Sequence, residues 1–138
     1  MIAYVDSSVL LRVMLGQDDA LAEWPDIERG VVSTLVEVEC LRTLDRLRVF
    51  HALPEEKVAA RREVVVRLLD SMEVVAVTAP VLRRAAQPFP VTLGTLDALH
   101  LATALLWMDA TGEAPVMATH DTALGCAARS MGLVTVGC

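Results

Sequence analysis

The chain has 138 residues, of which 54% are hydrophobic and 22% charged, and its formal net charge at pH 7 is −6. This length predicts one domain over residues 1–138, and the apolar content excludes a disordered or low-complexity chain. Three cysteines at unrelated spacings exclude a disulfide scaffold and predict free thiols in a reducing compartment. The longest apolar stretch, from Ala98 to Met108, is too short for the roughly 20 residues that cross a bilayer. We therefore expect a soluble, cytoplasmic domain with no membrane partner.

Short β-branched or apolar runs alternate with helical patterns along the chain. In chain order they predict a strand over residues 2–5, a helix over 8–15, a weaker helix over 18–24, a strand over 31–33, helices over 35–50 and 55–71, a fifth, less regular strand over 73–77, helices over 79–86 and 96–110, a strand over 116–119, a helix over 122–131 and a strand over 133–136. Strands separated by helical crossovers predict an α/β fold, with a parallel sheet of four to five strands and helices on both faces.

Two acidic residues come directly after predicted strands. Asp6 follows the first strand, and Asp121 follows the strand that ends at Thr119. The carboxyl ends of parallel strands meet at one edge of the sheet, where ligands of open α/β folds bind. Each carboxylate would also serve as the N-cap of the next helix, a role that Asp commonly fills. The presence of both at the same edge favours a functional role.

Asp97 lies in the first turn of the most apolar predicted helix, after Thr95 as the expected N-cap. It shares a helix face with Leu101, Ala104 and Met108, so we expect its side chain to point inward. A carboxylate near a helix N-terminus is favoured by the helix dipole, which is the purely structural interpretation. A buried carboxylate also requires a partner or a cation, which makes Asp97 a functional candidate.

Two glutamates near the start of the next long helix have different expected roles. Residues Thr34 to Glu37 have the form of a capping box, which gives Glu37 a structural role. Glu39 lies about 200° further around the helix, on one face with Arg42 and Arg46. A surface ion pair with these arginines and a functional role both remain open for Glu39.

Four acidic residues therefore lie where elements end near one edge of the predicted sheet. They are Asp6, Glu39, Asp97 and Asp121. If they converge to about 4 Å, each pair repels by about 4 kcal/mol at an effective dielectric constant of about 20. A domain stable by on the order of 5–15 kcal/mol must then protonate some of them or bind a cation. Oxygen ligands select Mg²⁺ or Mn²⁺, whose bound water attacks phosphodiesters.

Segments that contain these acids resemble a known family. They are residues 4–11 (YVDSSVLL), 33–44 (STLVEVECLRTL), 95–102 (TLDALHLA) and 118–121 (ATHD), followed by 127–133 (AARSMGL). With these segments in this order, the sequence resembles PIN-domain ribonucleases and, most closely, VapC-type toxins of bacterial toxin–antitoxin pairs. Each segment alone is a weak signal, whereas the ordered set is specific.

The resemblance implies a three-layer α/β/α sandwich and an endoribonuclease that depends on Mg²⁺ or Mn²⁺. The implied catalytic residues are Asp6, Glu39, Asp97 and Asp121. The three aspartates would hold one or two metal ions, and Glu39 would orient the attacking water. Ser8 and Thr119 match supporting polar positions of the family. His120 departs from the family pattern, and we expect it to be inert.

The resemblance also implies an RNA substrate and a cognate antitoxin. Arg12, Arg42 and Arg46 would contact flanking phosphates or the antitoxin. Because the net charge is −6, RNA binding would depend on a local arginine patch, the metal and the shape of the RNA. An antitoxin arginine that reached the acidic cluster would displace the metal. Exposed apolar helix faces would suit a homodimer.

Three other interpretations compete with the nuclease. A Mg²⁺-dependent receiver domain requires a lysine at a late strand end, but the single lysine, Lys57, lies in mid-chain. A phosphatase that forms an aspartyl phosphate requires a second Asp two residues after Asp6, where this chain has Ser8. A PIN-like binding subunit without catalysis is the third alternative, and the presence of all four acids gives no sign of degeneration.

Overall fold

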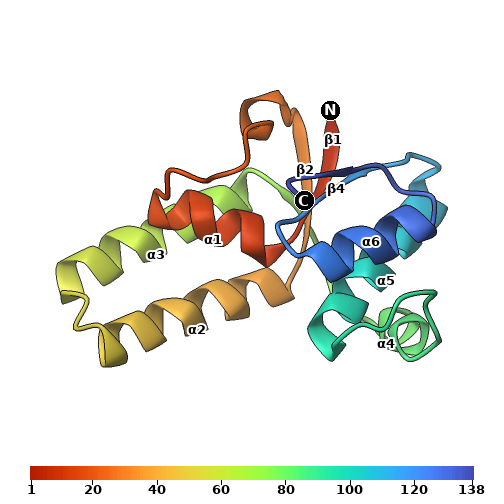
Figure 1. Cartoon of the computed structure of the whole chain (residues 1–138). Coiled ribbons are helices and arrows are strands. Elements are labelled where there is room, and N and C mark those ends of the chain that lie inside the picture. Colours follow the sequence, from red (N-terminus) through yellow and green to blue (C-terminus); the bar gives the residue numbers. More distant parts are fainter.

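A sheet of five parallel strands lies between two layers of helices in the structure, a computed structural model that describes residues 1–138 (Figure 1). The strands are β1 (Ile2–Val5), β2 (Arg29–Ser33), β3 (Glu73–Val75), β4 (Val116–Ala118) and β5 (Thr135–Val136). The helices are α1 (Ser7–Leu15), α2 (Leu35–Phe50), α3 (Glu55–Asp70), α4 (Ala79–Ala85), α5 (Thr95–Thr111) and α6 (Thr122–Ser130), with one 3-10 turn, η1 (Trp24–Asp26). The predicted α/β/α sandwich with a parallel sheet is confirmed.

The two helical layers cover opposite faces of the sheet. Helices α1, α2 and α3 lie on one side, α5 and α6 lie on the other, and α4 packs against α5 (Figure 1). Neighbouring strand residues point to opposite faces. Ala3 and Val5 therefore join the core under α1–α3, whereas Tyr4 and Met117 join the core under α5 and α6. Burial on both faces explains why these strands are apolar throughout.

The strand order is β3-β2-β1-β4-β5, so the direction in which strands are added reverses at β1. β1 pairs in parallel with β2 on one side and with β4 on the other. Such a reversal leaves a crevice at the carboxyl ends of the two central strands, where open α/β sheets bind ligands. Asp6 follows β1 and Asp121 follows β4, so the fold brings two of the predicted acids to either side of this crevice.

The weak helix predicted over residues 18–24 is wrong. Gly16 ends α1 in the left-handed conformation, and turns lead from there to η1 at Trp24. Arg12 holds this connection because its Nη1 donates to the backbone oxygen (3.1 Å) and to the carboxylate (2.8 Å) of Asp19. Pro25 lies in the first turn of η1, a position that suits its missing N–H. Hydrogen bonds from the Arg12 side chain thus hold this connection in place of the backbone hydrogen bonds of a helix.

Two predicted helix caps are also wrong. Thr34 precedes α2 with helical backbone angles and its side chain makes no cap bond, while its N–H donates to the backbone oxygen of Val75 (3.0 Å). The N–H of Leu35 instead donates to Ser33 Oγ (3.2 Å). Glu37 is consequently an exposed residue without a capping role. Thr95 is the first residue of α5, and the extended residue before it is Gly94, so no side chain caps this helix.

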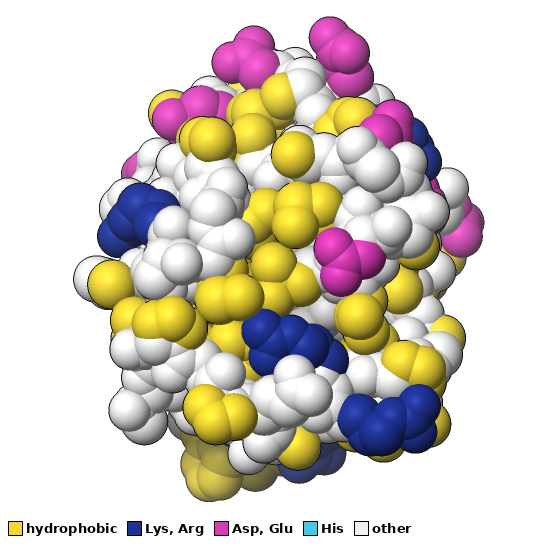
Figure 2. Space-filling model, turned by 90° about the vertical axis from the view of Figure 1, so that its right-hand side faces the viewer, with side chains coloured by type: hydrophobic (Ala, Val, Ile, Leu, Met, Phe, Trp, Pro, Cys, Tyr) yellow, Lys and Arg dark blue, Asp and Glu magenta, His cyan; other side chains and the backbone are white.

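The face on the α4–α6 side of the molecule carries much apolar surface. Apolar side chains form a band down the middle of this face, and acidic side chains gather at its upper end (Figure 2). Leu82, Leu93 and Leu99 help to line a hollow of about 300 Å³ between α4 and α5. None of the helices combines the length and the apolar character that crossing a bilayer requires. All three cysteines are unpaired, as their spacing predicts.

Candidate active site

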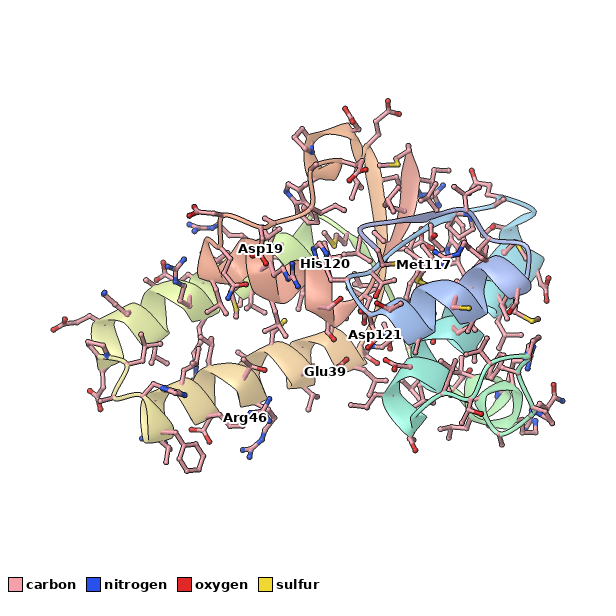
Figure 3. All side chains as sticks on the ribbon, viewed as in Figure 1. Asp19, Glu39, Arg46, Met117, His120 and Asp121 are labelled. Carbon is pink, nitrogen blue, oxygen red and sulfur yellow. The ribbon has the colours of Figure 1, made fainter.

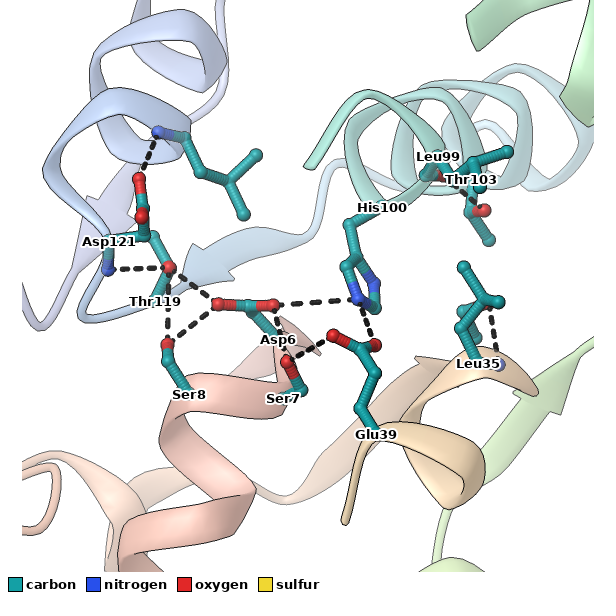
Figure 4. Close-up of polar contacts among 12 residues, drawn as sticks. Asp6, Ser7, Ser8, Leu35, Glu39, Leu99, His100, Thr103, Thr119 and Asp121 are labelled. Atoms are coloured by element: carbon teal, nitrogen blue, oxygen red, sulfur yellow. Dashed lines mark hydrogen bonds and ion pairs between the residues drawn. The ribbon is translucent and has the colours of Figure 1, made fainter. Parts of the chain in front are cut away.

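Asp6 lies at the centre of a hydrogen-bond network at the carboxyl end of β1 (Figure 4). Its side chain is buried, and its Oδ2 accepts hydrogen bonds from Ser8 Oγ (2.6 Å) and Thr119 Oγ1 (2.8 Å). Thr119 Oγ1 in turn accepts from the N–H of Asp121 (3.0 Å). Two hydroxyls thus fix one oxygen of Asp6, while Oδ1 has only long contacts, to Ser7 Oγ at 3.4 Å and His100 Nε2 at 3.6 Å.

Glu39 reaches the same network from the first turns of α2. His100 Nε2 lies 2.7 Å from Glu39 Oε1, and Ser7 Oγ donates to Glu39 Oε2 (2.8 Å). His100 is fully buried on α5, and its other ring nitrogen, Nδ1, lies 3.0 Å from the hydroxyl of Tyr4. The imidazole therefore lies between two acids from different elements, Asp6 and Glu39. Because one nitrogen atom contacts both, the two carboxylates lie close together.

Asp97 lies three residues before His100 on α5 and is partly buried. No donor of the chain forms a hydrogen bond with its carboxylate. Burial and then the negative charges of Asp121 and Asp6 together raise the pKa of Asp97 to about 6, although the nearby His100 lowers it. The raised pKa places Asp97 in the same electrostatic cluster and marks it as a carboxylate that lacks a cation.

His100 responds to the same charges in the opposite direction. Burial lowers its pKa, but the hydrogen bond with Glu39 and the charges of Asp6, Glu39 and Asp97 outweigh burial and raise the pKa above the ordinary value of 6.5. Protonation of the ring would supply the only positive charge that forms an ion pair with the cluster, since no lysine or arginine pairs with its acids. One imidazole cannot balance four carboxylates.

Asp121 caps α6, as its alternative interpretation predicted. Its Oδ1 accepts from the N–H of Leu124 (2.8 Å), which leaves Oδ2 without a donor from the chain. Asp6 makes no such bond, so capping explains Asp121 in part and Asp6 not at all. Asp121, directly before α6, and Glu39 on α2 come from the two opposite helical layers (Figure 3).

The donor set of this cluster fits a hard divalent cation in its chemistry but is not closed around one position. Carboxylate and hydroxyl oxygens predominate, as Mg²⁺ and Mn²⁺ prefer. No three side chains among the acids, histidines and cysteines come close enough to form a finished ligand set. The oxygens without strong donors, on Asp6, Asp97 and Asp121, are those that remain able to bind an ion.

Comparison with known proteins identifies the family. The PIN domain family matches residues 3–127. The chain belongs to the PIN-domain family. It is 30% identical over 139 aligned positions to a curated Mycobacterium tuberculosis protein named Ribonuclease VapC47, covering 96% of this chain and 93% of that protein.

Two solved structures share the fold of this PIN domain. A toxin–antitoxin complex from Klebsiella pneumoniae contains a chain with a TM-score of 0.66 and 16% identity, covering 97% of this chain and 95% of that one. A crystal structure of a Pyrobaculum aerophilum protein gives a TM-score of 0.62 and 22% identity, covering 98% of this chain and 84% of that one. At these identities the two structures support the fold alone.

The three predicted arginines of this PIN domain do not bind Asp6, Glu39, Asp97 or Asp121. Arg12 pairs with Asp19 at 2.8 Å, and Arg42 pairs with Asp45 at 3.4 Å. Arg46 donates to Thr43 Oγ1 at 3.0 Å. The surface ion pair between Glu39 and the arginines of its own helix is therefore absent, which leaves Glu39 free for another role. Arg42 and Arg46 line a groove of about 310 Å³ that also contains Glu39.

Sequence reasoning missed Ser7, His100 and Tyr4 as members of the network. Ser7 adjoins Asp6, and His100 follows Asp97 by three residues on the same helix face, a spacing that could have indicated both. His120 points elsewhere: its Nδ1 lies 2.9 Å from the carbonyl oxygen of Gly137, and its Nε2 is buried without a partner. The expectation that His120 is inert stays a prediction.

Proposed function

We propose that this PIN domain is a Mg²⁺- or Mn²⁺-dependent endoribonuclease and the toxin of a type II toxin–antitoxin pair. The observation that carries the proposal is the cluster of uncompensated carboxylates at the crevice where the strand order reverses. The clearest sign that positive charge is lacking near these acids is Asp97, whose pKa is raised to about 6. The 30% identity to a protein named as a ribonuclease supports the same reaction.

The ion is held by Asp6, Asp97 and Asp121. Ser8 and Thr119 keep one oxygen of Asp6 fixed, so that its other oxygen is presented to the ion. A bound divalent ion supplies a more acidic water and neutralises charge on the scissile phosphate. Asp97 and Asp121 would each have a carboxylate oxygen available for the ion, since neither side chain is fully restrained by the chain.

Glu39 orients the attacking water and accepts its proton. Its two oxygens are each held by one donor, which leaves lone pairs on both that are directed to other partners. A carboxylate fixed in this way acts as a general base without first having to be ordered. The side chain of Glu39 is 17% exposed, so water can reach its carboxylate.

RNA lies along the groove that contains Glu39. Arg42 and Arg46 are exposed on the wall of this groove and contact the phosphates that flank the scissile bond. Arg12, already paired with Asp19, is available to a phosphate or to an antitoxin only if that pair opens. Because the chain carries a net charge of −6, local arginines and the ion contribute the attraction that bulk charge does not.

The antitoxin binds over the same crevice and removes the ion. A basic side chain of the antitoxin would take the place of the missing cation among the four acids, which explains how inhibition follows from the charge balance. Growth arrest on expression of the chain, relieved by the neighbouring reading frame, tests this part. The exposed Leu82 and the apolar hollow that it helps to line between α4 and α5 would suit a homodimer, which sedimentation of the free protein tests.

Cleavage of a total RNA pool, with mapping of the new ends, tests the enzymatic part. We expect the wild type to cut in Mg²⁺ or Mn²⁺ and to stop in EDTA, and Asp6→Asn to be inactive. Glu37→Gln is the matched control, since Glu37 is an exposed acid two residues from Glu39 that makes no contact with the cluster. Cleavage by Asp6→Asn at the wild-type rate would assign the activity to another site, and a wild type that never cuts would favour the non-catalytic PIN-like subunit.

A further inference from the structure

His100 connects three elements of the PIN domain through one imidazole ring. It projects from α5, and it meets Tyr4 from β1 and Glu39 from α2. Its side chain has no solvent exposure, so these contacts are made without competition from water. A histidine in this position either completes the core or holds the carboxylate that it touches.

The contacts determine where the ring carries its proton. Glu39 Oε1, at 2.7 Å from Nε2, is a carboxylate oxygen and can only accept, so the proton lies on Nε2. In the neutral ring Nδ1 is then the acceptor, and the hydroxyl of Tyr4, 3.0 Å away, donates to it. The chain of donors runs from Tyr4 to His100 to Glu39, and it sets both the tautomer and the plane of the ring.

Glu39 is held by one donor on each oxygen. His100 binds Oε1, and Ser7 Oγ binds Oε2 at 2.8 Å. The arginines on its own helix bind other partners, so these two donors are the ones that orient the carboxylate. Both donors also lie near Asp6 Oδ1, Ser7 Oγ at 3.4 Å and His100 Nε2 at 3.6 Å, but each lies much closer to Glu39 (Figure 4).

We propose that His100, oriented by the hydroxyl of Tyr4, is the positioning residue that holds Glu39 in place to accept the proton of the attacking water. Mutation of a residue that orients a functional side chain in this way typically lowers activity about 10–100-fold. This inference rests on the proposed nuclease function. It assigns His100 and Tyr4 a role in the turnover of bound RNA and none in RNA binding.

Two substitutions of His100 separate positioning from packing. The amide nitrogen of Gln reaches the place of Nε2 and can donate to Glu39, whereas that of Asn reaches only the place of Nδ1. We expect His100→Asn to lower kcat about 10–100-fold with unchanged KM for RNA, and His100→Gln to recover most of the loss. Rates are normalised to the folded fraction from thermal melting. Equal loss in both variants would reveal a packing role and overturn the proposal.

Two further experiments do not depend on whether the His100 variants fold. One is the kinetics of Tyr4→Phe, and the other is nitrogen NMR of the metal-free wild type. Tyr4→Phe removes one buried hydroxyl, and we expect a smaller loss of kcat, again at constant KM. Nitrogen NMR of the metal-free wild type should find the His100 proton on Nε2, shielded from exchange, and Glu39→Gln should shift that signal. A proton on Nδ1 of a neutral ring overturns the proposal.

The outcomes distinguish this inference from the proposed function. If the wild type cuts RNA and His100→Asn cuts it equally fast, the positioning role fails and the nuclease stands. If His100→Asn raises KM and leaves kcat unchanged, the residue serves RNA binding, and the positioning role again fails. If the wild type itself never cuts RNA under any divalent ion, both proposals fail together.

Discussion

Glu73 and Glu113 at the amino end of the strands are paired with an arginine, whereas the clustered acids at the carboxyl end are not. At the amino end of the strands, Arg29 binds Glu73 and Glu113, each at 2.8 Å, and lies over the ring of Trp107 at 5.3 Å. Trp107 Nε1 also donates to Glu73 at 2.9 Å. The hydrogen bonds from Trp107 and then Arg29 hold the pKa of Glu73 below its ordinary value. Every charge of this group has a partner.

At the carboxyl end, the acids have hydroxyls and one imidazole as partners and no arginine. Burial and neighbouring carboxylates raise the pKa of Asp97 to about 6, in contrast to the lowered pKa of Glu73. The same residue types therefore stabilise one end of the strands and leave the other end with excess negative charge. An edge of the second kind gains stability only when a cation or a basic partner arrives.

The largest expected effect comes from removing a charge at the carboxyl end. Asp97→Asn should lower the rate of RNA cleavage about 1,000-fold or more, since the ion loses a ligand worth several kcal/mol of transition-state stabilisation. The same substitution should raise the melting temperature of the metal-free protein at neutral pH, because it relieves repulsion. Cleavage rates and melting curves of the same preparation check both. A variant that melts lower and cuts normally would contradict the assignment.

Addition of the ion should come next in size. Mg²⁺ or Mn²⁺ at about 100 times its Kd should stabilise the wild type by about 2.7 kcal/mol, because the ion binds only the folded cluster. Thermal melts with the metal and with EDTA measure this difference. Asp6→Asn should show little of it, whereas Glu73→Gln at the other edge should show all of it. A rise of equal size in both variants would mean that the ion binds elsewhere.

A pH dependence should follow from the raised pKa of Asp97. The unfolded chain ionises this residue near its ordinary value of 3.8 and the folded chain only near 6, so ionisation costs the folded state stability as pH rises between these values. The melting temperature of metal-free Asp97→Asn minus that of the wild type should therefore increase from about pH 4 to pH 6 and stay constant at higher pH. A constant difference across this range would refute the shift.

The smallest effect belongs to the amino end. Glu73→Gln should leave cleavage unchanged and lower stability by about 1 kcal/mol or less, since partly exposed ion pairs contribute little. Because the folded pKa of Glu73 is lowered, its contribution is present above about 4.5 and is lost as pH falls through the folded value. Melts at neutral and acidic pH compare the variant with the wild type. A loss of activity in Glu73→Gln would show that the two edges are not independent.

The location of the acids could be predicted from the sequence because it depends on local pattern and topology. Asp6 and Asp121 follow buried strands, and parallel strands end at one edge, so their approach required no knowledge of side-chain contacts. The alternation of strands and helices predicted a parallel sheet, whereas the order of the strands around β1 was found only in the structure. Helix geometry also separated Glu39 from Glu37, although the capping box that was the other part of that argument does not form.

Tertiary structure decided which side chains touch. His100 and Glu39 are 61 residues apart, and Tyr4 and His100 are 96 apart, so no periodicity relates them. Arg12 likewise fixed the turn at Asp19 against a helical pattern. A sequence determines the face and the end of an element because these depend on neighbouring residues. The partner of a polar group depends on how separate elements pack, and burial then makes that one partner decisive, since water is no longer available in its place.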